Sequence, residues 1–202
     1  MILRIFEIIT QLVASTGYLG VFVTMTLEST LIPIPSEAVM PFAGFLAYEG
    51  KMDITILVLI SSAANVLGSI IAYIIGKYLG RGFVEKFGKY VLLDMGHVEL
   101  VEKWFQKYGA VTVLFSRMVP VVRTVNAVPA GIGEMNFFKF CLYTFLGSLP
   151  WNLALVLTGY FLKENWNILE RYTVYIDIVA AAAIIVILVY IARKIRWGAK
   201  AN

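Results

Sequence analysis

The sequence predicts an all-α polytopic membrane protein with two inverted repeats. Each repeat is a re-entrant helical hairpin followed by a transmembrane helix, and an additional C-terminal transmembrane helix and amphipathic interfacial helices complete the fold. Hydrophobic residues make up 60% of the 202 residues. Several apolar runs reach the about 18 residues that a membrane-spanning helix needs. Two further apolar segments are interrupted by prolines and charges, which predicts broken helices.

The first segment, 1–16, has the pattern of a helix lying in the membrane interface. Its apolar residues recur at helical spacing, and Arg4, Glu7 and Gln11 fall on one face. A helix with one apolar and one polar face lies along the membrane surface rather than across it.

Three uninterrupted apolar runs are predicted to be transmembrane helices: 54–76, 137–162 and 174–192. Together with the interrupted segments they fill the chain, so we expect 1–202 to form a single membrane domain.

The net charge of +4 does not indicate a nucleic-acid partner, because its distribution fits a membrane topology. Basic residues cluster in the stretch 77–107 and again after 192. Lysine and arginine accumulate in cytoplasmic loops. We therefore expect both stretches, and with them the C-terminus, to be cytoplasmic in a multi-pass membrane protein.

Two apolar segments, 17–46 and 109–133, are predicted to be re-entrant hairpins that enter and leave on the same side. The first contains Glu28 and Glu37, and the second contains Arg117 and Arg123. Backbone that is not helical survives at membrane depth only where protein or a watery cavity covers it. The residues expected to break the helices are Pro33, Pro35, Pro41 and Gly44 in the first hairpin, and Pro120, Pro129 and Gly131 in the second.

The two hairpin-and-helix units have matching spacings, which indicates a repeat. An Ala-Gly pair ends each hairpin, and 21 positions separate Gly44 from Asn65 and Gly131 from Asn152. With the stretch between the units in the cytoplasm, the first hairpin opens outside and the second opens inside. The two units are then inverted, an architecture typical of alternating-access transporters.

The region 80–108 between the units is predicted to be amphipathic and cytoplasmic. Val98, Val101, Trp104, Phe105 and Tyr108 share one helical face, and charged residues occupy the others. This pattern favours a helix at the cytoplasmic surface of the membrane.

The four charged hairpin residues need a compensating interaction, because each costs about 2.5–3.5 kcal/mol to insert into a membrane. One explanation is structural: Glu28 and Glu37 pair with Arg117 and Arg123 and pin the hairpins together. The other is a ligand site, because arginine matches phosphate in a bidentate geometry and broken helices expose N–H groups that favour anions. We expect Arg117 and Arg123 to bind phosphate.

Glu28 and Glu37 are predicted to gate the site or to couple transport to protons, since a low dielectric favours the protonated form of a carboxylate. Asn65, Asn126, Trp151 and Asn152 are candidates to line a cavity. For asparagines in spanning helices, hydrogen bonding to another helix is an equally good explanation. We expect no catalytic residue, metal or cofactor.

The segment FSRMVPVVRTVNAVPAGIGEMNFFKF, residues 115–140, resembles a motif of the DedA family, also described as SNARE-associated or VTT-domain membrane proteins. ESTLIPIPSEAVMPFAG, residues 28–44, resembles the family's acidic, proline-rich first motif. Met118 stands where the family usually has phenylalanine. The resemblance covers roughly 17–162.

The resemblance implies two facing re-entrant hairpins, with essential acids and arginines at Glu28, Glu37, Arg117 and Arg123. It also implies transport of a phosphate-headed lipid, with undecaprenyl phosphate, the carrier lipid of cell-wall synthesis, as the leading candidate and with protons as a possible coupled ion. A phosphatidylethanolamine flippase or scramblase and a proton-coupled small-ion transporter remain alternatives. The chain is predicted not to be an enzyme, and an oligomer is possible.

Overall fold

The computed structural model describes residues 10–30, 32, 35–91, 95–119 and 122–162. The predicted transmembrane helix 174–192 and the C-terminus lie outside the described residues, as do Pro33 and Pro120. Of the predicted interfacial segment, residues 10–16 are described and are helical.

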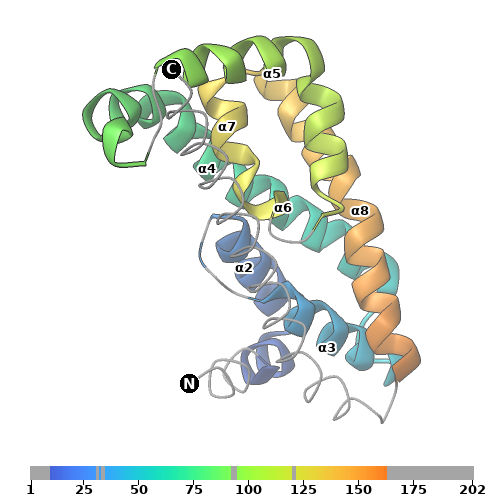
Figure 1. Ribbon diagram of the computed structural model, residues 1–202. Helices are drawn as coiled ribbons and strands as arrows, with labels where there is room; N and C mark the ends of the chain where they lie inside the picture. Colours follow the sequence, from blue (N-terminus) through green and yellow to red (C-terminus); the bar gives the residue numbers. More distant parts are fainter. Residues whose placement is uncertain (1–9, 31, 33–34, 92–94, 120–121, 163–202) are drawn as a thin grey trace, which may run out of the picture. The chain divides into compact units, whose positions relative to one another are not determined.

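Throughout the described part of the chain the secondary structure is helical and contains no strand, which confirms the predicted all-α class (Figure 1). The helices are α2 (Tyr18–Ser29), α3 (Ser36–Tyr48), α4 (Ile54–Val91), α5 (Met95–Ser116), α6 (Val122–Val125), α7 (Ala127–Ile132) and α8 (Phe137–Leu162).

Among the described residues, two helices are long and apolar enough to cross a membrane. They are the Ile54–Gly80 part of α4, with 27 residues, and α8, with 26 residues. A hydrocarbon layer about 30 Å thick needs about 20 residues of helix. Both helices expose large apolar side chains, among them Ile56, Leu59, Leu67, Ile71, Ile74, Leu142, Leu146, Leu153 and Phe161. These surfaces suit contact with lipid tails.

The break between α2 and α3 lies at residues 30–35. Pro35 is the N-cap of α3 in an extended conformation, with φ of −74° and ψ of 102°. Pro41 and Gly44 were expected to break the helix as well, and here the structure differs, since both lie inside α3. Proline fixes φ at a value close to that of a helix, so Pro41 removes one hydrogen bond without ending α3.

The second break follows Ser116, where α5 ends, and the chain resumes as the short helices α6 and α7. Pro129 and Gly131 lie within α7 rather than at the break. Pro129 is in the first turn of α7, where a missing N–H leaves no helical hydrogen bond unmade.

Two predicted boundaries fall inside continuous helices. α4 extends beyond residue 76 to Val91, and α5 continues through Gly109, which was expected to start the second hairpin. A single glycine within a helical pattern costs about 1 kcal/mol and does not by itself end a helix.

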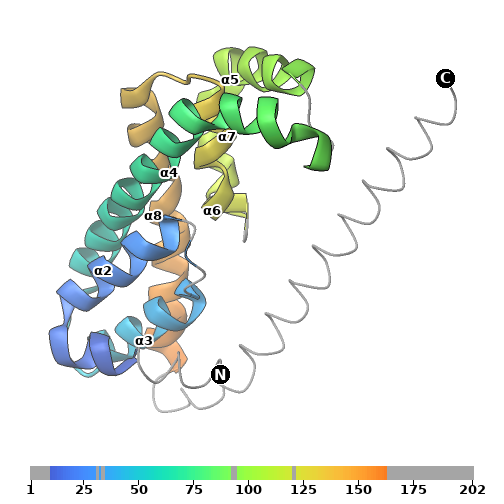
Figure 2. The same ribbon diagram turned by 90° about the vertical axis from the view of Figure 1, so that its left-hand side faces the viewer.

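The second arm of each hairpin region, α3 or α7, packs against the distal part of the long helix of the other unit. Gly159 of α8 lies against the carbonyl of Pro41 in α3, and Gly76 of α4 lies against the carbonyl of Val128 in α7. In both places an added Cβ would collide with the carbonyl oxygen. Figure 2 shows α3 beside α8 and α7 beside α4, in agreement with the contacts between these helices.

The first arm of each hairpin region, α2 or α5, packs against the long helix of its own unit in a corresponding way. Gly68 of α4 lies against Thr26 and Ser29 of α2, while Gly147 of α8 lies against Leu114 of α5 and the side chain of Arg117. The two hairpin regions are therefore held by reciprocal close contacts to the two long helices.

Two apolar cores flank a buried polar band. The first core gathers residues such as Met25, Val39, Leu57 and Val156, and the second gathers Ala72, Val113, Ala130 and Phe140. Along α4 and α8, the sequence between these two cores is rich in small polar residues, most of them buried. This polar band carries the candidate site.

Candidate functional site

The polar band is formed by small side chains that recur about every four residues along α4 and α8. Each is at most 2% exposed. This spacing puts them on one face of each helix, toward the protein interior. The residues are Ser61, Ser62, Asn65 and Ser69 on α4, and Thr144, Ser148 and Asn152 on α8.

Arg123 of α6 is the centre of an ion-pair cluster. Its Nη2 atom lies 2.7 Å from Oε1 of Glu28 and 3.5 Å from Oε1 of Glu37, and it also donates to the Ser36 hydroxyl. The side chains of Arg123 and Glu28 are 5% and 6% exposed, whereas that of Glu37 is 29% exposed. The cluster therefore joins the second hairpin region to both arms of the first.

Further hydrogen bonds orient this cluster. Thr124 donates to Oε1 of Glu28 at 3.4 Å, and Ser36 donates to Oε2 of Glu37 at 3.2 Å. The Arg123 guanidinium carbon lies 5.4 Å from the centre of the Trp151 ring on α8, which is a cation–π distance. All four helices α2, α3, α6 and α8 thus contribute to holding one guanidinium group.

Arg117, at the end of α5, is in a different environment. It is 2% exposed, and its Nη2 atom donates to the Ser69 hydroxyl of α4. Its Nε atom has no hydrogen-bond partner, and no carboxylate in the described part of the chain pairs with it. An unpaired buried charge is strongly unfavourable, so this guanidinium is well suited to an incoming anion.

The predicted pairing of two acids with two arginines is therefore uneven: both acids contact Arg123. Asn126, the N-cap of α7, donates through its Nδ2 atom to the Ser116 hydroxyl at the end of α5. This contact joins the start of α7 to the end of α5.

Asn65 and Asn152 both form hydrogen bonds between helices. Ser29 donates to Oδ1 of Asn65 at 3.2 Å, and Nδ2 of Asn152 donates to the Ser62 hydroxyl at 3.1 Å. Such bonds favour helix association within a membrane. Asn152 also keeps a free Oδ1 atom, so packing does not account for all of its polar groups.

Five buried polar atoms have no hydrogen-bond partner among the described residues. They are Arg117 Nε, Asn126 Oδ1, Thr144 Oγ1, Trp151 Nε1 and Asn152 Oδ1. Most buried polar groups in proteins are paired, so a cluster of unpaired ones suggests a site for a polar ligand. Three of the five belong to residues predicted to line a cavity.

Sequence reasoning did not single out Ser69 or Thr144. The signal that was available is the four-residue recurrence of small polar residues within two apolar runs.

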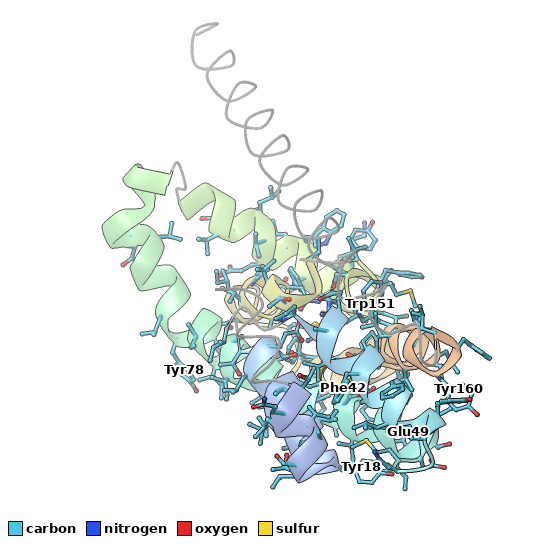
Figure 3. All side chains as sticks on the ribbon, turned by 90° about the horizontal axis from the view of Figure 1, so that it is seen from below. Tyr18, Phe42, Glu49, Tyr78, Trp151 and Tyr160 are labelled. Atoms are coloured by element: carbon cyan, nitrogen blue, oxygen red, sulfur yellow. The ribbon has the colours of Figure 1, made fainter. Side chains whose placement is uncertain are left out.

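Figure 3 shows Trp151 nearer the centre of the view, while Tyr78 and Tyr160 lie toward its edges.

The donor set of the site favours an anion over a metal. Among the described residues, no group of three or more histidine, cysteine, aspartate or glutamate side chains could hold a metal ion. Guanidinium, indole and hydroxyl groups donate hydrogen bonds, and the guanidinium groups carry positive charge.

Several known proteins have sequences similar to this chain. The model of the VTT domain matches residues 34–161. The chain is 36% identical over 191 residues to Undecaprenyl phosphate transporter A of Bacillus subtilis, covering 94% of each protein. It is 33% identical over 198 residues to an alkaline phosphatase-like protein of Lactococcus lactis, covering 93% of this chain and 92% of that protein.

A third relative is Protein DedA of Escherichia coli, which is 27% identical over 168 residues, with 79% of this chain and 76% of that protein covered. No solved structure matches the chain. With its domain match and the extent of its similarity to these relatives, the chain belongs to the VTT-domain family of membrane proteins, the family of DedA.

Proposed function

We propose that the protein is a transporter that moves a phosphate-headed lipid across the bacterial cytoplasmic membrane, with undecaprenyl phosphate as the first candidate. The observation that carries this proposal is the pair of buried arginines, one of which has no carboxylate partner among the described residues. Relatives named as undecaprenyl phosphate transporters in Bacillus subtilis and Staphylococcus aureus support the choice of lipid.

The lipid's phosphate would bind between Arg117 and Arg123, while its tail stays in the bilayer. Undecaprenyl phosphate has a single phosphate as its headgroup, so guanidinium and N–H donors are sufficient to recognise it. The exposed apolar side chains of α4 and α8 offer a surface for a polyprenyl chain.

The hairpin regions 17–46 and 109–133 are proposed to be re-entrant and inverted relative to each other. The reciprocal contacts support this. Gly159 and Gly76 each contact the second arm of the opposite unit, and Gly68 and Gly147 each contact the first arm of their own unit. In transporters built from inverted repeats, substrates bind near the membrane midplane, where broken helices meet. We further propose a cytoplasmic C-terminus.

Proton coupling follows from the charge balance of the site. Two arginines and two glutamates carry no net charge together, so a phosphate adds uncompensated negative charge. Protonation of a glutamate would restore the balance, and low dielectric favours that form. Glu28 and Glu37, the two carboxylates that contact Arg123, are the candidates for taking up this proton.

Phosphatidylethanolamine is a second candidate substrate. Its ammonium group needs an acidic partner, and the partly exposed Glu37 carboxylate could supply one. A small-ion transporter is less well supported, because Arg123 already contacts both acids. The name of the Lactococcus lactis relative also makes phosphate release worth measuring, although we propose that this chain is not an enzyme.

Reconstitution in liposomes tests the proposal. Movement of undecaprenyl phosphate and of phosphatidylethanolamine across the bilayer is measured for the wild type and for Arg117→Ala/Arg123→Ala, with and without a proton gradient, and inorganic phosphate is assayed in parallel. We expect movement of the polyprenyl lipid, loss of that movement in the double variant, and no release of phosphate. Movement of phosphatidylethanolamine alone would overturn the choice of substrate, and movement of neither lipid would overturn the proposal.

A further inference from the structure

The two buried arginines are not equivalent, and their difference shows where the phosphate first binds. Arg123 lies within 4 Å of two carboxylates, so its charge is already compensated. Among the described residues, Arg117 donates a hydrogen bond to the neutral hydroxyl of Ser69, its Nε–H has no partner, and no carboxylate lies within ion-pair distance of it. An anion gains more from the guanidinium whose charge is not yet paired.

The Arg117 side chain crosses α8 at Gly147. A Cβ added at Gly147 would lie 3.0 Å and 3.2 Å from Cβ and Cγ of Arg117, and 2.6 Å from the carbonyl oxygen of Leu114. The absence of a side chain at Gly147 therefore leaves the room in which the arginine stem lies.

Thr144 and Trp151 flank this crossing point. They are three residues before and four residues after Gly147, so all three share one face of α8. Side chains of a helix lean toward its N-terminus, which directs the Trp151 ring back over the turn that contains Gly147. Thr144 Oγ1 and Trp151 Nε1 are both buried without a partner in the described part of the chain.

Gly147 thus lies next to the Arg117 stem and on the same helix face as Thr144 and Trp151, and each of these three residues has a buried group without a partner among the described residues. The guanidinium and the indole donate only, and a threonine hydroxyl can donate as well as accept. A phosphate monoester has three terminal oxygens that accept such bonds, and its negative charge complements the guanidinium, which a neutral or cationic ligand would not do.

Building on the proposed transport function, we propose that Arg117 Nε, Trp151 Nε1 and the Thr144 hydroxyl form a phosphate-monoester site at Gly147. Ser69 is a positioning residue, which holds the guanidinium through Nη2 so that Nε remains directed into the site. The Arg123 cluster stays paired internally while the phosphate is first bound.

Binding is tested on the full chain in detergent, with Trp104, Trp166 and Trp197 changed to Phe so that Trp151 is the only tryptophan. Geranyl phosphate and inorganic phosphate are titrated separately. We expect a saturable change in Trp151 emission with geranyl phosphate. Equal affinity for inorganic phosphate would support the donor site but assign it to free phosphate rather than to a lipid headgroup.

Variants separate a positioning role from a structural one. Thr144→Val and Ser69→Ala should each weaken geranyl phosphate binding about tenfold, the usual size of one lost hydrogen bond to a charged group. Ser69→Thr keeps the hydroxyl and should restore binding. Thr158→Val is the matched control on α8, since the Thr158 side chain is exposed and its hydroxyl bonds the carbonyl of Ala154 in its own helix, at 2.7 Å.

The liposome assay distinguishes failure of this inference from failure of the proposed function. If the wild type moves undecaprenyl phosphate but Ser69→Ala and Thr144→Val behave like Thr158→Val in both binding and KM, the site at Gly147 is wrong and the transport function stands. If geranyl phosphate does not bind and no lipid moves, both are wrong.

Discussion

Two arginines of the same short segment differ because of what packs around each of them. Arg123 meets acids from both arms of the first hairpin region, whereas Arg117 donates to a serine of α4 and pairs with no carboxylate among the described residues. The high cost of burying charge was enough to single out these residues from the sequence. The pairing itself could not be predicted, because Glu28 and Arg123 are 95 residues apart and meet only through tertiary packing.

The role of Ser69 could not be predicted from the sequence either. A serine in an apolar run has many possible structural roles, including a bond to its own helix such as Ser61 makes with Val58. Only the position of α5 against α4 gives Ser69 its arginine partner. Single small polar residues therefore carried too little signal to be chosen from the sequence.

Neutralising Glu28 should destabilise the protein, because it leaves Arg123 buried with one incomplete partner. Breaking a buried ion pair costs about 3–5 kcal/mol, so Glu28→Gln is expected to lose an amount of this order in free energy of unfolding. Unfolding by denaturant in detergent measures it.

Glu49→Gln is the control for this prediction, because Glu49 pairs with Lys51 on the surface, where the lysine side chain is 64% exposed. Exposed pairs contribute about 0–1 kcal/mol. Similar losses in the two variants would show that the Arg123 cluster is not a stabilising ion pair.

At the scale of helices, the sequence predicted the long apolar runs and both breaks near the charged residues. It misplaced Pro41 and Gly44, which lie inside α3. Both face α8, where Pro41 meets Gly159 and Gly44 meets the carbonyl of Val156. Residues that looked like helix breakers serve close packing instead, a distinction that depends on a helix distant in the sequence.

Gly159→Ala and Gly76→Ala should each destabilise the protein, because the new methyl group would overlap a carbonyl oxygen of the packed arm. Overpacking typically costs about 1–3 kcal/mol. Thermal unfolding in detergent measures the effect of each.

Gly82→Ala is the matched control in the same long helix, since nothing lies within 4 Å of an added Cβ there. Alanine favours a helix over glycine by about 1 kcal/mol, so this variant should be neutral or slightly stabilising. A loss of stability in Gly82→Ala equal to that in Gly76→Ala would contradict the packing account.

For the whole molecule, the sequence was sufficient to identify the family and the all-α class, because both depend on motifs and on apolar runs within the chain. The inverted arrangement remains a proposal. It is supported by reciprocal contacts of Gly76 and Gly159, and it makes a prediction about the side of the membrane on which each hairpin opens.

Cysteine labelling tests the topology, starting from Cys141→Ala, since Cys141 is the chain's one cysteine. With a reagent that does not cross membranes, Ser15→Cys and Lys51→Cys should label only from outside, because they flank the first hairpin. Lys107→Cys and Lys139→Cys should label only from the cytoplasm. Labelling of the two residues of either pair from opposite sides would contradict a re-entrant hairpin.

The most direct test of the central claim is the rate at which undecaprenyl phosphate crosses a liposome membrane that contains the purified protein. The account predicts a rate well above that of protein-free liposomes for the wild type and the protein-free rate for Arg117→Ala/Arg123→Ala. A wild-type rate equal to that of protein-free liposomes, or an undiminished rate in the double variant, would contradict it.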